Sequence, residues 1–161
     1  MDSLFIKYYE KTLVWEGGAK LHNVEGDSGG WTKYGIAYNY NKHHFDSLDE
    51  FKEMSFEKAC EITYENYYLT LHLDLVNPDA REQLFDIAFN AGVKRAFILA
   101  QRALGLTDDG ICGKVTKACL KNLDNTKLYN ERVKFYMSLA KNNSKLNKFL
   151  KGWLRRANDF K

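Results

Sequence analysis

The chain has 161 residues, enough for one domain or for a domain with an integral C-terminal subdomain. Apolar residues make up 45% of it and charged residues 28%, as in ordinary globular proteins, and the net charge is only +3. No apolar run can span a bilayer, and the N-terminal sequence has neither a basic n-region nor a clean apolar h-region. We therefore expect no membrane insertion, and synthesis in the cytoplasm without a Sec signal peptide.

The first predicted helix, over about residues 3–16, ends on an acidic residue. Apolar side chains recur along it at helical spacing, and Glu16 continues that series. Gly17 and Gly18 follow directly and predict the end of the helix. Burial and the negative end of the helix dipole both disfavour a charged carboxylate here, which favours a Glu16 that keeps its proton near neutral pH. A general acid needs this property, although most glutamates at helix ends are solvated surface residues.

A glycine-rich loop follows, over about residues 18–36. It is too long and too rich in glycine for a passive connector, and long loops of compact domains are usually functional. The segment 31–36 has β character and predicts a short hairpin. The loop also carries Asp27 and, five residues later, Thr32, with Glu25 as an alternative carboxylate.

From about residue 47 onward the pattern is helical. Ser47 or Ser55 can cap short helices, and Asn77-Pro78 is a good N-cap and N1 pair for a longer helix that Gly92 closes.

The last predicted helix, over about 145–160, has an apolar face. We expect Trp153 to pack on it while Arg155 and Arg156 stay in solvent. The chain as a whole is predicted to be mainly α, a helical bundle with a small β element near its N-terminus.

Cysteine and histidine give no indication of a metal site. Cys60, Cys112 and Cys119 lack metal-binding spacing, and the four histidines fit no zinc motif. We expect free thiols, no metal and no other cofactor.

Charge is distributed unevenly along the chain. Residues 1–80 hold 7 Lys and Arg against 14 Asp and Glu, a net charge of −7, whereas residues 81–161 hold 17 against 7, a net charge of +10. A basic half suits an anionic polymer, either nucleic acid or bacterial cell wall. The alternative is attraction between two halves of one fold.

Several motifs together resemble one known family. EGG at 16–18 and DSGGWTKYGI at 27–36 are similar to the EGG…D-x-GG-x-T-x-x-GI signature of glycoside hydrolase family 108. Its members are N-acetylmuramidases of phage endolysins and of proteins once labelled secretion activators. Other stretches resemble the C-terminal peptidoglycan-binding region of the same proteins: 85–92, 100–101, 109–113 with 116, 132–136 and 149–156. The likeness covers nearly the whole chain, with departures at Ala19, Ser28 and Trp31.

The resemblance implies catalytic roles for three residues. Glu16 is expected to be the general acid of glycoside hydrolysis, and Asp27 the second carboxylate, unless it only caps its own loop. Thr32 is expected to hold the catalytic water, or else to be an ordinary strand residue. A carboxylate separation of about 6.5–9.5 Å predicts inversion at the anomeric centre, and one near 5 Å predicts retention.

Four further residues are candidates for binding the substrate. Tyr34 and Tyr38 can stack on sugar rings, or pack in the core. Asp86 and Asn90 lie one helical turn apart and can hydrogen-bond sugar hydroxyls or brace the hairpin, and for Asp86 we expect bracing at least as much as sugar binding.

The resemblance thus implies a lysozyme-like fold with a catalytic region at 1–76 and a helical peptidoglycan-binding region at 77–161. The expected function is cleavage of the β-1,4 bond between N-acetylmuramic acid and N-acetylglucosamine by a monomer. The protein would act on the cell wall after holin-dependent release or injection. The alternatives are a wall-binding protein without activity, a lytic transglycosylase, and a nucleic-acid-binding domain, for which the chain has no motif.

Overall fold

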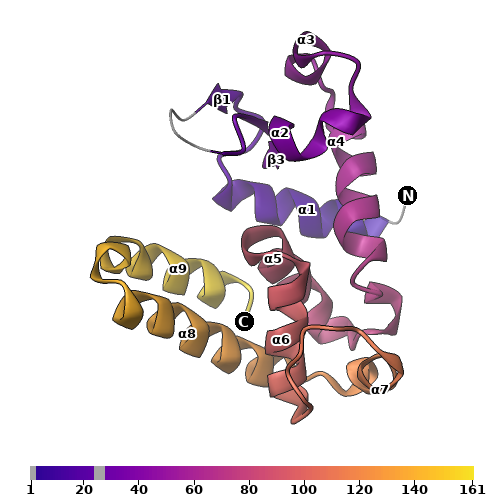
Figure 1. The fold of residues 1–161 in the computed structure, drawn as a ribbon. Coiled ribbons are helices and arrows are strands. Elements are labelled where there is room, and N and C mark those ends of the chain that lie inside the picture. The colour runs from indigo at the N-terminus through magenta and orange to yellow at the C-terminus, as the bar shows by residue number, and fades with distance from the viewer. Residues whose placement is uncertain (1–2, 24–27) are drawn as a thin grey trace. The chain divides into compact units, whose positions relative to one another are not determined.

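Helices make up most of the chain and one small sheet lies near the N-terminus, which confirms the expected mainly α fold class (Figure 1). The computed structural model describes residues 3–23 and 28–161. The chain divides into two units, Met1–Tyr68 (unit 1) and Leu69–Lys161 (unit 2), and each is described by itself. Within the described ranges, every helix is too short or too polar to cross a membrane.

Unit 1 places short strands and helices between two longer helical segments. Its elements are α1 (Ser3–Trp15), β1 (His22–Asn23), β2 (Trp31–Lys33), β3 (Ile36–Ala37), α2 (Tyr38–Asn41), the 3₁₀ turn η1 (Lys42–His44), α3 (Leu48–Lys52), α4 (Phe56–Thr63) and the π-helical η2 (Tyr64–Leu69), which ends one residue into unit 2.

The sheet has three antiparallel strands in the order β1-β2-β3, one more than the predicted hairpin. Lys33 pairs with Ile36, so Tyr34 and Gly35 form a two-residue turn between β2 and β3. Both have positive φ angles, 51° and 71°, as a type I′ turn requires. This conformation is easy for Gly35 but strained for a tyrosine, so neighbouring contacts must hold Tyr34 in place.

Helix α4 continues without a break into η2. It begins at the predicted cap, where the Ser55 hydroxyl accepts a hydrogen bond from the Lys58 N–H at 3.2 Å. On η2, the rings of Tyr64 and Tyr68 pack edge-on against Phe5 of α1, with centroids 5.1 and 5.6 Å away. These contacts fix η2 against α1.

In unit 2, four longer helices pack together: α5 with α6 and α8, and α8 also with α6 and α9. Helix α5 begins as predicted, with the Asn77 side chain accepting from the Asp79 N–H and Pro78 in the first turn, and it ends at Gly92. The elements of the unit are the 3₁₀ turn η3 (Leu73–Leu75), α5 (Pro78–Ala91), α6 (Val93–Leu104), α7 (Lys114–Cys119), η4 (Leu120–Asn122), α8 (Asn125–Asn142), η5 (Ser144–Leu146) and α9 (Asn147–Asp159).

A buried ion cluster joins three of these helices. Asp86 of α5 is fully buried and forms ion pairs with Arg132 of α8 and Arg156 of α9, whose Nη2 lies 2.8 Å from Asp86 Oδ1. The prediction that Arg156 stays in solvent is therefore wrong. Burial of a carboxylate requires a countercharge, and this one takes it from a helix 70 residues further along the chain.

Candidate active site

Glu16 is the residue that caps the C-terminus of α1. The buried stripe of α1 ends at Leu13, and the Leu13 carbonyl accepts a hydrogen bond from the Gly18 N–H at 2.9 Å. Gly17 and Gly18 both have positive φ angles, 82° and 68°, so the helix ends in a Schellman motif. The motif holds the half-buried Glu16 side chain at the end of a rigid element, next to the negative end of the helix dipole.

Tyr67 of η2 lies close enough to Glu16 to respond to its charge. Burial raises the pKa of Tyr67 above its ordinary value, and the negative charge of Glu16 raises it further. Charge effects of this kind weaken with distance, so the Tyr67 side chain lies within electrostatic range of Glu16, whereas Tyr64 and Tyr68 of η2 pack on Phe5 near the start of α1. Sequence reasoning missed Tyr67.

The same tyrosine lines a cleft of about 200 Å³ in unit 1. One wall comes from β3, the turn before it and α2, and the other from α4 and η2. The Asn66 amide donates to Asn41 Oδ1 at 3.2 Å, which ties η2 to α2 across the cleft. The lining residues are Gly35, Ile36, Ala37, Tyr40, Asn41, Ile62, Asn66 and Tyr67.

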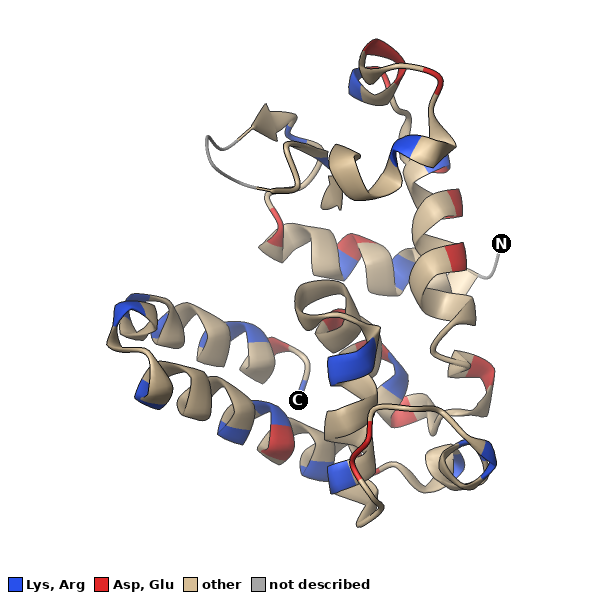
Figure 2. Cartoon of the chain, viewed as in Figure 1, with Lys and Arg blue, Asp and Glu red and all other residues tan. Residues whose placement is uncertain are grey.

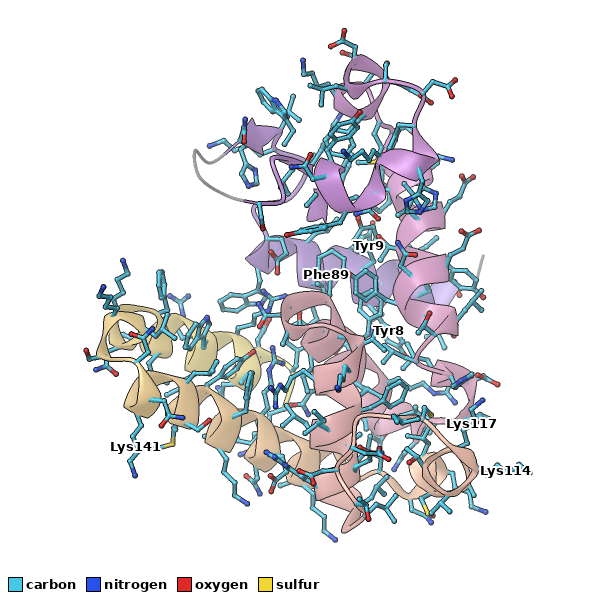
Figure 3. All side chains as sticks on the ribbon, viewed as in Figure 1. Tyr8, Tyr9, Phe89, Lys114, Lys117 and Lys141 are labelled. Atoms are coloured by element: carbon cyan, nitrogen blue, oxygen red, sulfur yellow. The ribbon has the colours of Figure 1, made fainter. Side chains whose placement is uncertain are left out.

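Tyr34 lies on the strained turn beside this cleft, where contacts with α1 and α4 hold it. The Tyr9 hydroxyl donates to the Tyr34 carbonyl at 2.8 Å, and the ring of Tyr34 lies 5.7 Å from that of Phe56. Burial raises the pKa of Tyr9, so this phenol keeps its proton and stays a donor. Figure 3 labels Tyr9 on α1.

The other two described candidates of unit 1 lie next to Tyr34 in the chain. Thr32 is on the central strand β2, half-buried, with its hydroxyl 3.5 Å from the Gly30 carbonyl. Tyr38 begins α2 and its ring packs 5.2 Å from that of Phe51. The structure therefore places all three on one β2–β3–α2 segment.

The predicted second carboxylate, Asp27, and its alternative, Glu25, lie outside the described residues. The chain that follows them is anchored on α2. The Asn39 amide donates to the Ser28 carbonyl at 2.8 Å, and its backbone N–H donates to the Gly29 carbonyl at 3.1 Å. Two hydrogen bonds from one asparagine thus fix where the loop rejoins the sheet.

The two candidates of unit 2 have different surroundings. Asp86 is fully buried in the ion cluster with both carboxylate oxygens bound to arginines, so its prediction as a sugar ligand is not supported and it braces α8 and α9 instead. Asn90 is exposed, and its Oδ1 accepts from the Tyr136 hydroxyl at 2.9 Å. Among the described residues, no group of three or more His, Cys, Asp or Glu could hold a metal ion.

Two family models match the sequence. The model described as Glycosyl hydrolase 108 matches residues 9–92, more than half of the chain, and one described as "Predicted Peptidoglycan domain" matches residues 95–158. The chain belongs to glycosyl hydrolase family 108. Family membership and the peptidoglycan domain together make it a peptidoglycan hydrolase, which acts on the cell wall.

One solved structure is similar to this chain over nearly its whole length. The structure of SagA from Brucella abortus is similar with 26% sequence identity and a TM-score of 0.77, covering 98% of this chain and 91% of that one. No curated protein matched the sequence. The two family models meet between residues 92 and 95, whereas the structural units meet at Tyr68 and Leu69, so the division at 76/77 stays a prediction.

Proposed function

We propose that this protein is an N-acetylmuramidase that cleaves the β-1,4 bond between N-acetylmuramic acid and N-acetylglucosamine, with Glu16 as general acid. The observation that carries the proposal is the place of Glu16. It lies on the C-cap of α1 beside Tyr67, which lines a cleft, in a chain of glycosyl hydrolase family 108. A carboxyl group on a helix end keeps its position while substrate binds, as proton transfer requires.

In this mechanism Glu16 donates its proton to the glycosidic oxygen as the bond to the anomeric carbon breaks. The leaving sugar takes the electron pair and the proton. Asp27, with Thr32, positions a water molecule on the opposite face of the ring, and the water oxygen bonds to the anomeric carbon while its proton passes to Asp27. The configuration then inverts, Asp27 releases its proton to solvent, and Glu16 takes up a proton from solvent, which restores both carboxyl groups.

Aromatic and amide side chains supply the contacts to the glycan. Tyr34 and Tyr38 stack on sugar rings, and Asn90 hydrogen-bonds the substrate with its exposed amide. Asp86 takes no part, because it is buried. We propose that the protein reaches the cell wall by holin-dependent release or by injection.

The experiment that tests the proposal compares Glu16→Gln with the matched control Glu10→Gln, an exposed glutamate of the same helix. The loss of a general acid lowers the rate by about 10²–10⁴. We expect Glu16→Gln to keep its fold and to lose wall clearing and release of new reducing ends by about that factor, while Glu10→Gln stays at the wild-type rate. A Glu16→Gln variant that clears walls normally contradicts the assignment.

Product chemistry separates the rival functions. Mass spectrometry of digested peptidoglycan should show reducing muramic acid ends, whereas a lytic transglycosylase leaves anhydromuramic ends. Wall binding without new ends would indicate a binding protein. Duplex DNA binding with a steep salt dependence would indicate a nucleic-acid-binding protein.

A further inference from the structure

Unit 2 contains several cavities, and one of them, of about 340 Å³, lies between helices α5, α6, α8 and α9. One wall is aromatic and aliphatic, formed by Phe135, Tyr136 and Leu139 of α8 and by Trp153 of α9, and Asn90 of α5 and Arg95 of α6 add polar groups to the lining. Its size is near the lower end of ligand sites, about 300–1,000 Å³, and suits a group the size of one sugar or a short peptide.

The aromatic wall is held in a fixed position. The ring of Trp153 stacks on that of Tyr136 with centroids 5.4 Å apart. The Tyr136 hydroxyl accepts from Arg132 Nε at 3.1 Å and donates to Asn90 Oδ1 at 2.9 Å. Arg132 in turn is ion-paired with the buried Asp86. The buried ion cluster therefore supports the wall of the cavity, and such a preorganised surface loses little entropy on binding.

Besides the Tyr136 hydroxyl, two polar side chains line the cavity, Asn90 and Arg95, and both present hydrogen-bond donors to a ligand. The side-chain carbonyl oxygen of Asn90 accepts from Tyr136, which orients the amide and leaves its NH₂ group to donate. The Arg95 guanidinium lies over the Phe135 ring at 4.7 Å, and no carboxylate among the described residues forms an ion pair with it. A site with an unpaired guanidinium, an amide donor and an aromatic wall suits a carboxylate attached to a small apolar group.

We propose that this cavity binds a carboxylate of the peptidoglycan stem peptide, with Arg95 and Asn90 on the carboxylate and alanine methyl groups of the peptide against Trp153 and Tyr136. The proposal rests on the proposed function, because it takes peptidoglycan as the substrate. The net charge of +10 on residues 81–161 favours approach of such an anionic group. The site would make the enzyme prefer peptide-bearing glycan.

The test titrates the full wild-type chain with N-acetylmuramyl-L-alanyl-D-glutamate and with its counterpart in which both glutamate carboxyls are amides. Binding is followed by the NMR shift of the Trp153 indole N–H, the single tryptophan of unit 2. We expect the acid to bind about tenfold more tightly than the amide, since one charge-assisted contact is lost. Arg95→Gln and Asn90→Asp should each abolish that preference, because one removes the cation and the other adds a repelling charge.

The matched control is Lys141→Gln, which removes one positive charge from an exposed position on α8 that points away from the helices in Figure 3. It should keep the preference. Equal binding of acid and amide by the wild type, or a preference that persists in Arg95→Gln, overturns the site.

Failure of the site and failure of the proposed function give different results. A wild-type chain that releases reducing ends from peptidoglycan but binds acid and amide alike keeps the muramidase function and overturns the site. A chain that shows the Arg95-dependent preference but releases no reducing ends keeps the site and overturns the muramidase function. The site is also overturned if tetra-N-acetylchitotetraose, which carries no carboxylate, shifts the Trp153 signal while the acid does not.

Discussion

At the scale of single residues, the charge of Glu16 acts on Tyr67 although 51 positions separate the two residues in the chain. The end of α1 could be predicted, because Gly17 and Gly18 after an amphipathic stripe indicate a Schellman motif. Tyr67 could not, since it lies on the π-helical turn η2, and such turns arise from tertiary packing rather than from a local motif. π-Helical turns often occur at functional sites, in agreement with the cleft beside this one.

This pairing predicts a titration effect that does not depend on activity. The negative charge of Glu16 contributes to the raised pKa of Tyr67, so Glu16→Gln should lower the Tyr67 pKa toward its ordinary value. The direction follows because a nearby negative charge disfavours the tyrosinate anion. NMR titration of ¹³Cζ-labelled tyrosine measures it, with Glu10→Gln as the control. An unchanged Tyr67 pKa in Glu16→Gln would show that the two side chains are not neighbours.

At the scale of elements, the helices of unit 2 are joined by charges as well as by apolar packing. The start of α5 at Asn77 and its end at Gly92 could be predicted from caps, because capping is local. The ion cluster on Asp86 could not, because its partners are 46 and 70 residues away and Arg156 has neighbours typical of a solvated helix face. The same limit explains why the sequence left two interpretations of Asp86 open, a sugar ligand or a brace.

Breaking this cluster should destabilise the protein strongly. Asp86→Asn leaves two buried guanidinium groups without their countercharge, and removal of one partner of a buried ion pair costs about 3–5 kcal/mol. The matched control is Asp108→Asn, which breaks the exposed pair with Arg102 and should cost less than about 1 kcal/mol. Chemical denaturation measures both free energies of unfolding. Similar losses for the two variants would show that the cluster has no structural importance.

At the scale of the whole molecule, the uneven charge is a property of the described surface as well as of the sequence. Lys and Arg recur along α8 and α9 in Figure 2, and Lys145 of η5 is exposed, as are Lys148 and Lys151 of α9. The buried arginines of the ion cluster use only part of this excess. The sequence alone suggested either an anionic partner or attraction within the fold, and the family match favours the cell wall as the partner.

For binding to peptidoglycan, the position of the positive charges should therefore matter more than their number. In a Glu16→Gln background, which leaves the wall intact, Lys148→Gln with Lys151→Gln should weaken binding to purified peptidoglycan about three- to tenfold. Lys7→Gln with Lys20→Gln removes the same charge from exposed positions of unit 1 and should have a smaller effect. The difference should vanish near 1 M salt, where charges are screened within about 3 Å. Equal weakening by both pairs would mean that net charge alone governs binding to the wall.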